Sequence, residues 1–272
     1  MARGKFSPSS IRTTKLTNQA DDMPGILVLR PAHQAEDLGL QLQQSGFVVR
    51  SFPTIEIQPY SDSNTTELLQ HINDFDLLIF ISRNAVDYFI QCCPEGHESL
   101  PTALPIGFAT AQALKKYNFN RFDINSSQYD SESLLNHFTL RQVTNQKILI
   151  VRGHGGRELL KDTLSQRGAD VQYLEIYERC LARHPAGIFE QLWQQGISAT
   201  IATSNQIIDN LFKLTDSPLL SELKKRPLVV ISERMKQFAA DCGFEHIYLA
   251  ASPSDKEIVK TLKELQKQAI LV

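Results

Sequence analysis

The sequence has no long hydrophobic run and no dominant sign of charge. Nowhere in its 272 residues does a stretch approach the about 18 uninterrupted apolar residues of a membrane-spanning helix, so we expect no membrane partner. The 28 Lys and Arg residues nearly balance the 30 Asp and Glu residues, and the formal net charge of −2 argues against a nucleic-acid partner. The composition that remains, 42% hydrophobic and 21% charged, is that of a globular protein able to fill a sizeable core.

The sequence also lacks the spacings that most cofactor sites require. Its four cysteines form no Cys-x-x-Cys pair and its seven histidines form no His-x-x-x-His pair, so we expect no metal site and interpret the cysteines as small apolar core residues. No Gly-x-Ser-x-Gly elbow occurs, which argues against an α/β-hydrolase. Residues 153–156 (GHGG) resemble the beginning of a dinucleotide-binding turn, but Glu158 occupies the position of the third glycine. The better interpretation is a turn that directs backbone amides at an acidic ligand, in a cytoplasmic protein without a cofactor.

Residues 1–22 differ in composition from the rest of the chain. They carry basic residues among serines and threonines, without the apolar core of a secretory signal. The periodic pattern begins at Gly25, just after a second methionine, Met23. We therefore expect residues 1–22 to be a disordered N-terminal extension, and mass spectrometry of the native N-terminus would show whether they are made.

An internal repeat organises the remaining sequence. Residues 26–30 (ILVLR) are matched 122 positions later by residues 148–152 (ILIVR). The same offset aligns three further pairs: Gly46 with Gly168, Ser82 with Ser204, and Asp87 with Asp209. With three residues inserted, Gly107 matches Ser232. The order of these matches indicates a duplicated chain.

Within each copy, short apolar runs alternate with amphipathic windows. The runs have the length and β-branched content of strands, at residues 25–30, 76–82, 104–108, 147–152, 198–203 and 228–231. The windows predict helices at residues 34–45, 83–91, 109–117, 131–138, 155–167, 205–214, 233–241 and 254–268. Ser131 and Ser254 are candidate N-caps, and Asn118 and Gly243 are candidate left-handed C-caps. The alternation predicts parallel sheets covered by helices on both faces.

Two extended segments interrupt this alternation at equivalent places in the two copies, residues 52–57 and 173–178. A strand that follows another strand without a helix between them suits a connector, so we expect the two segments to pair and to join two α/β lobes. The predicted boundaries are 1–22 for the extension, 24–52 and 183–272 for lobe 1, 53–60 and 173–182 for the connector strands, and 61–172 for lobe 2.

Candidate ligand-binding residues follow the strands, because ligands of α/β sheets bind at the carboxyl ends of the strands. Arg30 and Arg152 end the first strand of each copy, and Ser82 and Ser204 begin the next helices. A serine at this position usually only caps its helix. The alternative is that the helix N-terminus, with its free amides and its dipole, faces an anion. Tyr177 on the second connector segment is either a proton donor between the lobes or an aromatic side chain that packs on the ladder.

Five short segments occur in order along the chain: residues 78–86 (LIFISRNAV), 106–111 (IGFATA), 151–153 (VRG), 174–179 (LEIYER) and 251–253 (ASP). Together they resemble the uroporphyrinogen-III synthase family, from about residue 24 to the end of the chain. The resemblance implies two flavodoxin-like or Rossmann-like lobes with parallel sheets, joined by a two-stranded β-ladder. It also implies an active site in the cleft between the lobes and no metal or organic cofactor.

The resemblance further implies an activity and a substrate. Members of this family act in tetrapyrrole biosynthesis, the route to porphyrins and haem, where they convert linear hydroxymethylbilane to uroporphyrinogen III with inversion of the last pyrrole ring and loss of water. The chain would then be a lyase whose partner is a small-molecule substrate with eight carboxylates. It would be a cytoplasmic monomer, in at most transient contact with the preceding enzyme of the pathway. A near-neutral protein can hold such a substrate through local amides and a few arginines.

Site residues follow from the same resemblance. Tyr177 is the predicted proton donor that assists departure of the substrate hydroxyl. The carboxylates of the substrate are predicted to bind to Ser82, Arg83, Thr110, Arg152, Gly153, Ser204, Arg30 and Ser232. One turn departs from the family pattern, because Ser232-Glu233-Arg234-Met235 stands where many members have a Gly-Pro-Thr-Thr-like sequence. The threonine contact is therefore not carried over, Ser232 or Arg234 takes its place, and Glu233 is expected to face solvent.

Two other functions are compatible with a two-lobed α/β chain, because a fold does not imply a function. The first is a non-catalytic cytosolic protein that binds a small polycarboxylate, and the second is a flavodoxin-like regulator. The absence of a secretory signal and the internal repeat count against a periplasmic type of binding protein. Incubation with hydroxymethylbilane separates the three functions, since only the enzyme forms the type III product.

Overall fold

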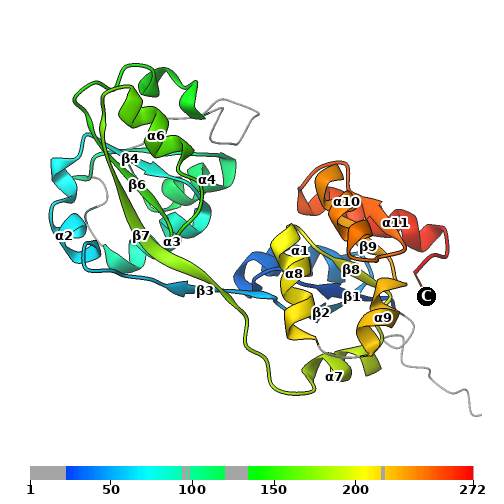
Figure 1. Ribbon diagram of the computed structural model, residues 1–272. Coiled ribbons are helices and arrows are strands. Elements are labelled where there is room, and N and C mark those ends of the chain that lie inside the picture. The colour runs from blue at the N-terminus through cyan, green and yellow to red at the C-terminus, as the bar shows by residue number, and fades with distance from the viewer. Residues whose placement is uncertain (1–22, 94–95, 97–98, 120–133, 216–217, 272) are drawn as a thin grey trace, which may run out of the picture. The chain divides into compact units, whose positions relative to one another are not determined.

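The structure, a computed structural model, describes residues 23–93, 96, 99–119, 134–215 and 218–271 (Figure 1). The chain divides into two compact units. Unit 1 consists of Met1–Ile55 and Ala182–Val272, and unit 2 is the continuous segment Glu56–Leu181. The predicted extension at residues 1–22 and the predicted helix cap Ser131 lie outside the described residues.

Unit 1 is built on a five-stranded parallel sheet with the strand order β10-β9-β8-β1-β2. Its strands are β1 (Gly25–Val28), β2 (Val48–Ser51), β8 (Ala199–Ile201), β9 (Leu228–Val230) and β10 (Ile247–Leu249). Its helices are α1 (Ala32–Gln44), α7 (Ile188–Gln194), α8 (Asn205–Leu214), α9 (Leu219–Lys224), α10 (Glu233–Asp241) and α11 (Asp255–Lys267). In strand β1, which lies between β8 and β2, Ile26 pairs with Val49 on one side and Ala199 on the other. All four residues of β1 are buried, as expected of a strand that is covered on both faces.

Helix α11 shows how local sequence signals build the core of unit 1. Ser254 caps the helix by accepting a hydrogen bond from the amide of Glu257 at 3.4 Å, which confirms the predicted N-cap. The buried face of α11 joins a cluster with residues of β1 and α1, through Ile258, Val259, Leu262 and Leu265. The predicted left-handed C-caps are also confirmed, because Asn118 and Gly243 have φ angles of 57° and 89°.

Unit 2 is built on a second sheet, with the strand order β3-β7-β6-β4-β5. Its strands are β3 (Ile55–Pro59), β4 (Leu77–Phe80), β5 (Thr102–Pro105), β6 (Lys147–Gly153) and β7 (Asp170–Leu181). Its helices are α2 (Thr65–Gln70), α3 (Arg83–Cys92), α4 (Phe108–Lys116) and α6 (Leu159–Gln166), with short 3-10 turns η1 (Ile72–Asp74) and η3 (Phe138–Leu140). Successive residues of β4 enter two different core clusters, Leu78 with α3 and Ile79 with α6, so helices cover both faces of the sheet.

The two predicted connector segments are neighbours, but they do not form a separate ladder. The first segment begins just after β2 of the unit 1 sheet and contains the beginning of β3 of the unit 2 sheet. Hydrogen bonds from the amide of Ala182 to the carbonyl of Thr54 (3.3 Å) and from Tyr60 to Ile176 (3.0 Å) show that β3 runs antiparallel to β7. Since β7 also pairs with β6 along most of its length, the ladder is the edge of the unit 2 sheet.

Several predicted boundaries are wrong. The strand predicted at residues 104–108 is β5 at Thr102–Pro105, because Gly107 is the N-cap of α4. The helix predicted at residues 155–167 begins only at Leu159, because Gly155 and Gly156 adopt φ angles of 71° and 110°. Strands β2 and β10 and helices α2, α7 and α9 are not predicted. The three helices have six or seven residues, which is too short a window to show a helical period.

The strand orders of the two sheets correspond to each other. The run β2-β1-β8-β9 in unit 1 matches the run β7-β6-β4-β5 in unit 2. Because β1 to β5 come from the first copy of the repeat and β6 to β10 from the second, each sheet combines strands of both copies. The winding reverses between β1 and β8 in unit 1 and between β6 and β4 in unit 2. Ligands of α/β sheets bind beside such switch points, at the carboxyl ends of the strands.

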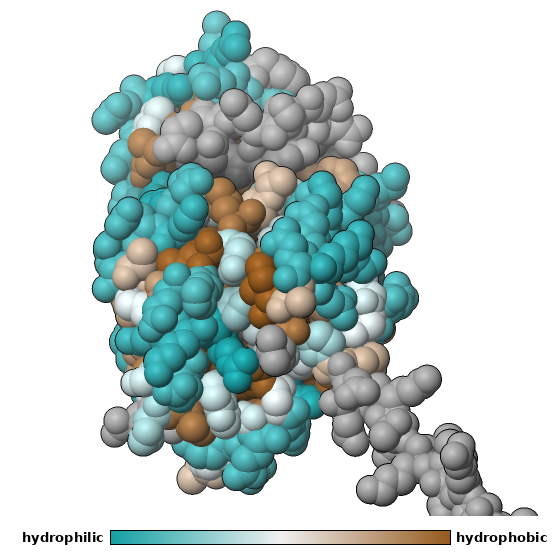
Figure 2. Space-filling view, turned by 90° about the vertical axis from the view of Figure 1, so that its right-hand side faces the viewer, coloured by the Kyte–Doolittle hydropathy of each residue, from teal (hydrophilic) through white to brown (hydrophobic). Residues whose placement is uncertain are grey.

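The surface is of mixed polarity. Figure 2 shows one face of the molecule, on which hydrophilic side chains predominate and hydrophobic ones form small groups between them. In the part of the chain that the structure describes, none of the helices has both the length and the hydrophobicity needed to cross a membrane. Over the same residues, no group of three or more His, Cys, Asp or Glu side chains is arranged to hold a metal ion.

Candidate active site

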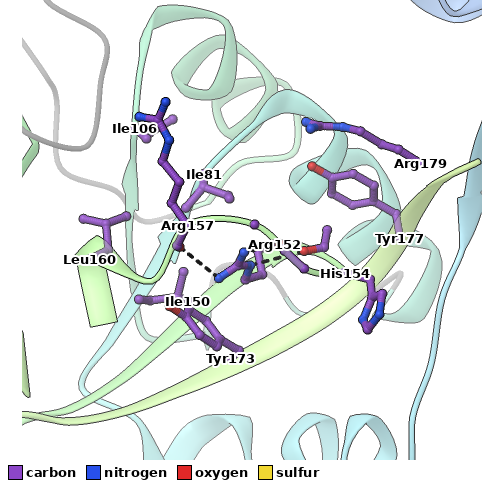
Figure 3. Close-up of a pocket in the computed structure, with 13 residues that line it drawn as sticks. Ile81, Ile106, Ile150, Arg152, His154, Arg157, Leu160, Tyr173, Tyr177 and Arg179 are labelled. Carbon is purple, nitrogen blue, oxygen red and sulfur yellow. Dashed lines mark hydrogen bonds between the residues drawn. The ribbon is translucent and has the colours of Figure 1, made fainter. Parts of the chain in front are cut away.

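The candidate site is a pocket of about 330 Å³ at the carboxyl edge of the unit 2 sheet, where the winding reverses between β4 and β6 (Figure 3). Ile81 and Ile106, which follow β4 and β5, give it an apolar side. Figure 3 shows Tyr177 and Arg179 extending from β7 and Arg157 extending from the turn after β6. With Tyr173 and Arg152, which also line it, the pocket combines apolar walls with two phenols and three guanidinium groups.

Tyr177, the predicted proton donor, is held on several sides. It is 1% exposed, and its hydroxyl lies 3.0 Å from Oγ of Ser82, a pair in which either oxygen can donate. Tyr88 stacks on its ring at a centroid distance of 5.7 Å. Gly153 lies so close that a Cβ atom there would come within 2.5 Å of the ring. The ring thus packs in the core, as one of the two interpretations of the sequence predicted, and the residue also lines the pocket.

Ser82 is both a helix cap and the partner of this phenol. Its Oγ accepts a hydrogen bond from the amide of Ala85 at 3.0 Å, which makes Ser82 the N-cap of α3. The same oxygen contacts the hydroxyl of Tyr177. The beginning of α3 therefore fixes the position of the phenol's hydrogen-bond partner.

Arg152 is 2% exposed, and its guanidinium group binds the protein's own backbone. Nε donates to the carbonyl of Gly153 at 3.2 Å, Nη1 to that of Arg157 at 3.3 Å, and Nη2 to that of Gly155. The guanidinium also lies over the ring of Tyr173, 4.3 Å from its centroid. Arg152 therefore lines the pocket with most of its donors already satisfied by the turn that follows it.

The turn after β6 leaves backbone amides free at the pocket. The amide of Gly155 donates to the carboxylate of Glu175 at 3.0 Å. Among the described residues, the amides of Gly156 and Arg157 have no hydrogen-bond partner, and both residues line the pocket. Nor do the side chains of Arg157 and Arg179 form an ion pair within that part of the chain. These amides and guanidinium groups are available to an anion.

Two other titratable side chains that line the pocket are His154 and Tyr173. Nδ1 of His154 lies 2.8 Å from Oε2 of Glu175, and its ring stacks on Tyr60 at 4.2 Å. Burial, reinforced by the nearby carboxylate of Glu158, raises the pKa of Tyr173 to about 12. The phenol of Tyr173 therefore stays neutral at physiological pH, in contrast to the cations around it.

Two further predicted residues of unit 2 lie on neighbouring helices. Arg83 is the first residue of α3, where it is exposed and forms an ion pair with Asp87 at 3.4 Å. Thr110 lies in the first turn of α4 and is 3% exposed. Neither residue lines the pocket described above.

The remaining predicted residues belong to unit 1. Arg30, which follows β1, forms an ion pair with Asp255 at 2.5 Å. Ser204 and Ser232 are the N-caps of α8 and α10, where each hydroxyl accepts a backbone amide at 3.2 and 3.3 Å. Glu233 is exposed in the first turn of α10, which confirms its predicted orientation toward solvent. The structure thus brings Tyr177, Ser82, Arg152 and Gly153 together and places Arg30, Ser204 and Ser232 in the other unit.

Known proteins match the chain along nearly its whole length. The sequence model of the uroporphyrinogen-III synthase HemD family matches residues 36–260. The chain belongs to the uroporphyrinogen-III synthase family. It is 32% identical over 247 residues to the uroporphyrinogen-III synthase of Salmonella typhimurium, an alignment that covers 88% of this chain and 99% of the relative. It is 30% identical over 244 residues to that of Escherichia coli K12, with the same two coverages. A third relative, from Synechococcus elongatus, is 33% identical over 201 residues and covers 71% of this chain and 75% of its own.

Solved structures of the uroporphyrinogen-III synthase family share the fold. The Helicobacter pylori protein superposes with a TM-score of 0.62 at 16% identity, and covers 89% of this chain and 100% of its own. A mutant of the Thermus thermophilus protein superposes with a TM-score of 0.59 at 16% identity, with coverages of 90% and 99%. Two α/β units, each built on a mainly parallel sheet, are therefore the architecture of this family.

Sequence reasoning overlooked three residues that line the pocket of this member of the uroporphyrinogen-III synthase family: Tyr173, Arg157 and Arg179. The signal for Arg179 was present, because the two-residue period of a strand groups it with Tyr177 on β7. The period does not account for Tyr173, because the register of β6 and β7 shifts before Tyr177, and Tyr173 packs against the core cluster on the opposite face. No such signal existed for Arg157. Arg157 lies in a turn whose conformation depends on Gly155 and Gly156. The direction of its side chain therefore cannot be predicted from the period of a helix or a strand.

Proposed function

We propose that this chain closes hydroxymethylbilane to uroporphyrinogen III, with inversion of the last pyrrole ring and loss of water, and that it is a lyase of tetrapyrrole biosynthesis. The observation that carries the proposal is the family match over residues 36–260, joined by relatives named uroporphyrinogen-III synthase at 30–33% identity. The pocket in unit 2 supports it, since it offers to a polycarboxylate the phenol of Tyr177 and the guanidinium groups of Arg157 and Arg179, which form no ion pair with the described residues.

The proposed first step uses Tyr177 as a general acid. Its phenol donates a proton to the hydroxyl of the substrate, the carbon–oxygen bond breaks, and water leaves an electrophilic azafulvene. The Ser82 hydroxyl, 3.0 Å away, can donate a hydrogen bond to the phenolate that results. Attack from the substituted carbon of the terminal ring leads through a spiro intermediate to the inverted product. The proton released on final closure restores the phenol, so one water is the net by-product.

The proposed role of the other residues is to hold carboxylates and fold the chain of the bilane. Positioning matters more than a strong nucleophile here, because the azafulvene is itself reactive and closes unaided to the type I isomer. The free amides of Gly156 and Arg157 and the side chains of Arg157 and Arg179 are the contacts that the unit 2 pocket supports. The remaining predicted carboxylate contacts stay part of the proposal: Gly153, Arg83, Thr110, Arg30, Ser204 and Ser232.

The decisive experiment incubates the purified chain with freshly made hydroxymethylbilane and resolves the type I and type III products. We expect the type III isomer in the presence of the chain and the type I isomer alone in its absence. Type I product formed at the uncatalysed rate would contradict the proposal. A chain that binds the bilane without forming type III product would instead be the non-catalytic polycarboxylate-binding protein. Size-exclusion chromatography of the same sample tests the proposed monomer, and cell fractionation tests the proposed cytoplasmic location.

A further inference from the structure

Arg152 is a buried cation that binds both carboxylates and neutral carbonyl groups. It lies 3.4 Å from a carboxylate oxygen of Glu158 and 3.7 Å from one of Glu175. Its guanidinium donates to the carbonyls of Gly153, Gly155 and Arg157, which all belong to the turn that follows it. A guanidinium that is 2% exposed needs such partners, because an unsatisfied buried N–H group is costly. The turn is therefore wrapped around the guanidinium, with these three carbonyls directed inward.

The inward carbonyls determine where the amides point. In a trans peptide unit the carbonyl oxygen and the amide hydrogen of the next residue lie on opposite sides. The carbonyl of Gly155 is bound to Arg152, so the amide of Gly156 in the same peptide unit faces away from the guanidinium. That amide has no partner among the described residues, and Gly156 lines the pocket. The buried cation thus leaves a free donor on the opposite side of the turn.

Two glycines keep the turn in close contact with its neighbours. A Cβ atom on Gly156 would lie 2.6 Å from Nη2 of Arg152, and one on Gly153 would lie 2.5 Å from the ring of Tyr177. The amide of His154, between them, donates to the carbonyl of Tyr177 at 2.7 Å. One end of the turn is therefore fixed on Tyr177 and the other is fixed on Arg152.

We propose that Arg152 is a positioning residue and not a carboxylate ligand: from inside the protein it holds residues 153–157 in the conformation that exposes the Gly156 amide and supports Tyr177. The expected effect on the substrate rests on the proposed synthase function. The expected effect on the turn itself does not, because it concerns the free protein. The two parts can therefore be tested separately.

The experiment compares Arg152→Met and Arg152→Lys with the matched control Arg167→Met. Arg167 lies at the other end of α6, where its Nη1 donates to the carbonyls of Leu135 (2.8 Å) and Leu140 (2.6 Å). Hydrogen exchange is measured for a peptide that covers residues 153–160, and KM and kcat are measured for hydroxymethylbilane. We expect Arg152→Met to accelerate exchange in the turn and to raise KM and lower kcat, together by roughly ten- to a hundredfold in kcat/KM. In Arg152→Lys the side chain retains a hydrogen-bond donor, so the slow exchange of the turn and the value of kcat/KM should be partly restored. Arg167→Met should lower the melting temperature without changing exchange in the turn, KM or kcat.

Gly156→Ala provides a second variant if Arg152→Met does not fold. Its methyl group pushes on the guanidinium without removing the charge, so it should reproduce the loosened turn and the raised KM. Unchanged exchange in the turn in both variants would overturn the proposal, as would loosened exchange with unchanged KM and kcat. Raised KM with unchanged exchange would identify Arg152 as a direct ligand. Failure of the proposed function would show differently, as absence of type III product from the parent chain.

Discussion

At the residue scale, the phenol of Tyr177 and the hydroxyl of Ser82 form a pair whose position depends on three different elements. Ser82 is fixed as the N-cap of α3, Tyr177 is fixed in β7, and Gly153 at the end of β6 leaves the space that the ring occupies. A buried phenol with one hydroxyl partner has little freedom to move. If it transfers a proton, it does so from a preorganised position.

Replacing Tyr177 with phenylalanine tests this proton transfer. The ring remains and only the hydroxyl is lost, so the core packing is retained. We expect kcat for type III product to fall by at least about tenfold, because the departing hydroxyl loses its acid. Stability should fall by about 1 kcal/mol for the lost hydrogen bond to Ser82. Product formation and urea unfolding measure the two effects.

Tyr88→Phe is the matched control for that variant. Tyr88 stacks on Tyr177, and its hydroxyl donates to the carbonyl of Ile57 at 2.7 Å. The variant should lose a similar free energy of unfolding, about 1 kcal/mol, with kcat unchanged. Equal kcat for Tyr177→Phe and Tyr88→Phe would show that Tyr177 contributes packing and not a proton.

At the scale of elements, serine N-caps begin four of the helices that the structure describes: Ser82 for α3, Ser204 for α8, Ser232 for α10 and Ser254 for α11. Each hydroxyl accepts one amide that the first turn would otherwise leave without a partner. Of the four, only Ser82 has a contact to the phenol. Comparing Ser82 with another of these caps therefore separates the effect of losing a helix cap from the effect of losing the contact to Tyr177.

The comparison uses Ser82→Ala and Ser254→Ala. Both variants lose an N-cap, so each should lower the free energy of unfolding by about 1 kcal/mol. Only Ser82→Ala should also lower kcat, since it leaves the Tyr177 hydroxyl without its partner. Urea unfolding and product formation are measured on the same samples. A loss of kcat that is equal in both variants would indicate a general effect of stability on activity.

Helix α8 shows what the sequence predicts well, and α6 shows where it fails. Residues 205–214 are predicted and observed as a helix. A serine cap marks the beginning of this helix and a regular apolar face marks its length. For α6, the apolar face is present but the first residues are drawn into the turn around Arg152. Long-range contacts of a buried side chain decide that boundary, and no local pattern contains them.

The candidate site was predictable to a similar degree. The equivalence of Ser82 and Ser204, which the repeat revealed, correctly identified two helix beginnings. The equivalence of Arg30 and Arg152 in the repeat did not extend to their partners. Arg30 pairs with Asp255 of α11, whereas Arg152 binds carbonyls of its own turn and pairs with Glu158 and Glu175. Equivalent positions in a duplicated sequence share backbone geometry, but each side chain takes partners from its own surroundings.

At the scale of the whole molecule, the sequence repeat and the compact units divide the chain in different ways. The first copy supplies β1 and β2 to one sheet and β4 and β5 to the other. Each pair is completed only by strands of the second copy: β1 pairs with β8, and β4 pairs with β6. The unit, and not the copy, is therefore the smallest piece with a complete sheet.

Fragments of similar length test this division. Residues 56–181 contain all of the unit 2 sheet except Ile55, the first residue of β3, and should unfold in urea as one cooperative transition. Unit 1 should do the same when residues 23–55 are joined to 182–271 by a short Gly-Ser linker, because the amide of Ala182 already lies 3.3 Å from the carbonyl of Thr54.

The control is residues 23–146, one copy of the repeat. It should lack a cooperative transition, because without β6 the buried side chains of Leu78 and Phe80 lose a neighbouring strand. Circular dichroism during urea unfolding measures all three, and cooperative folding of the control alone would contradict the division.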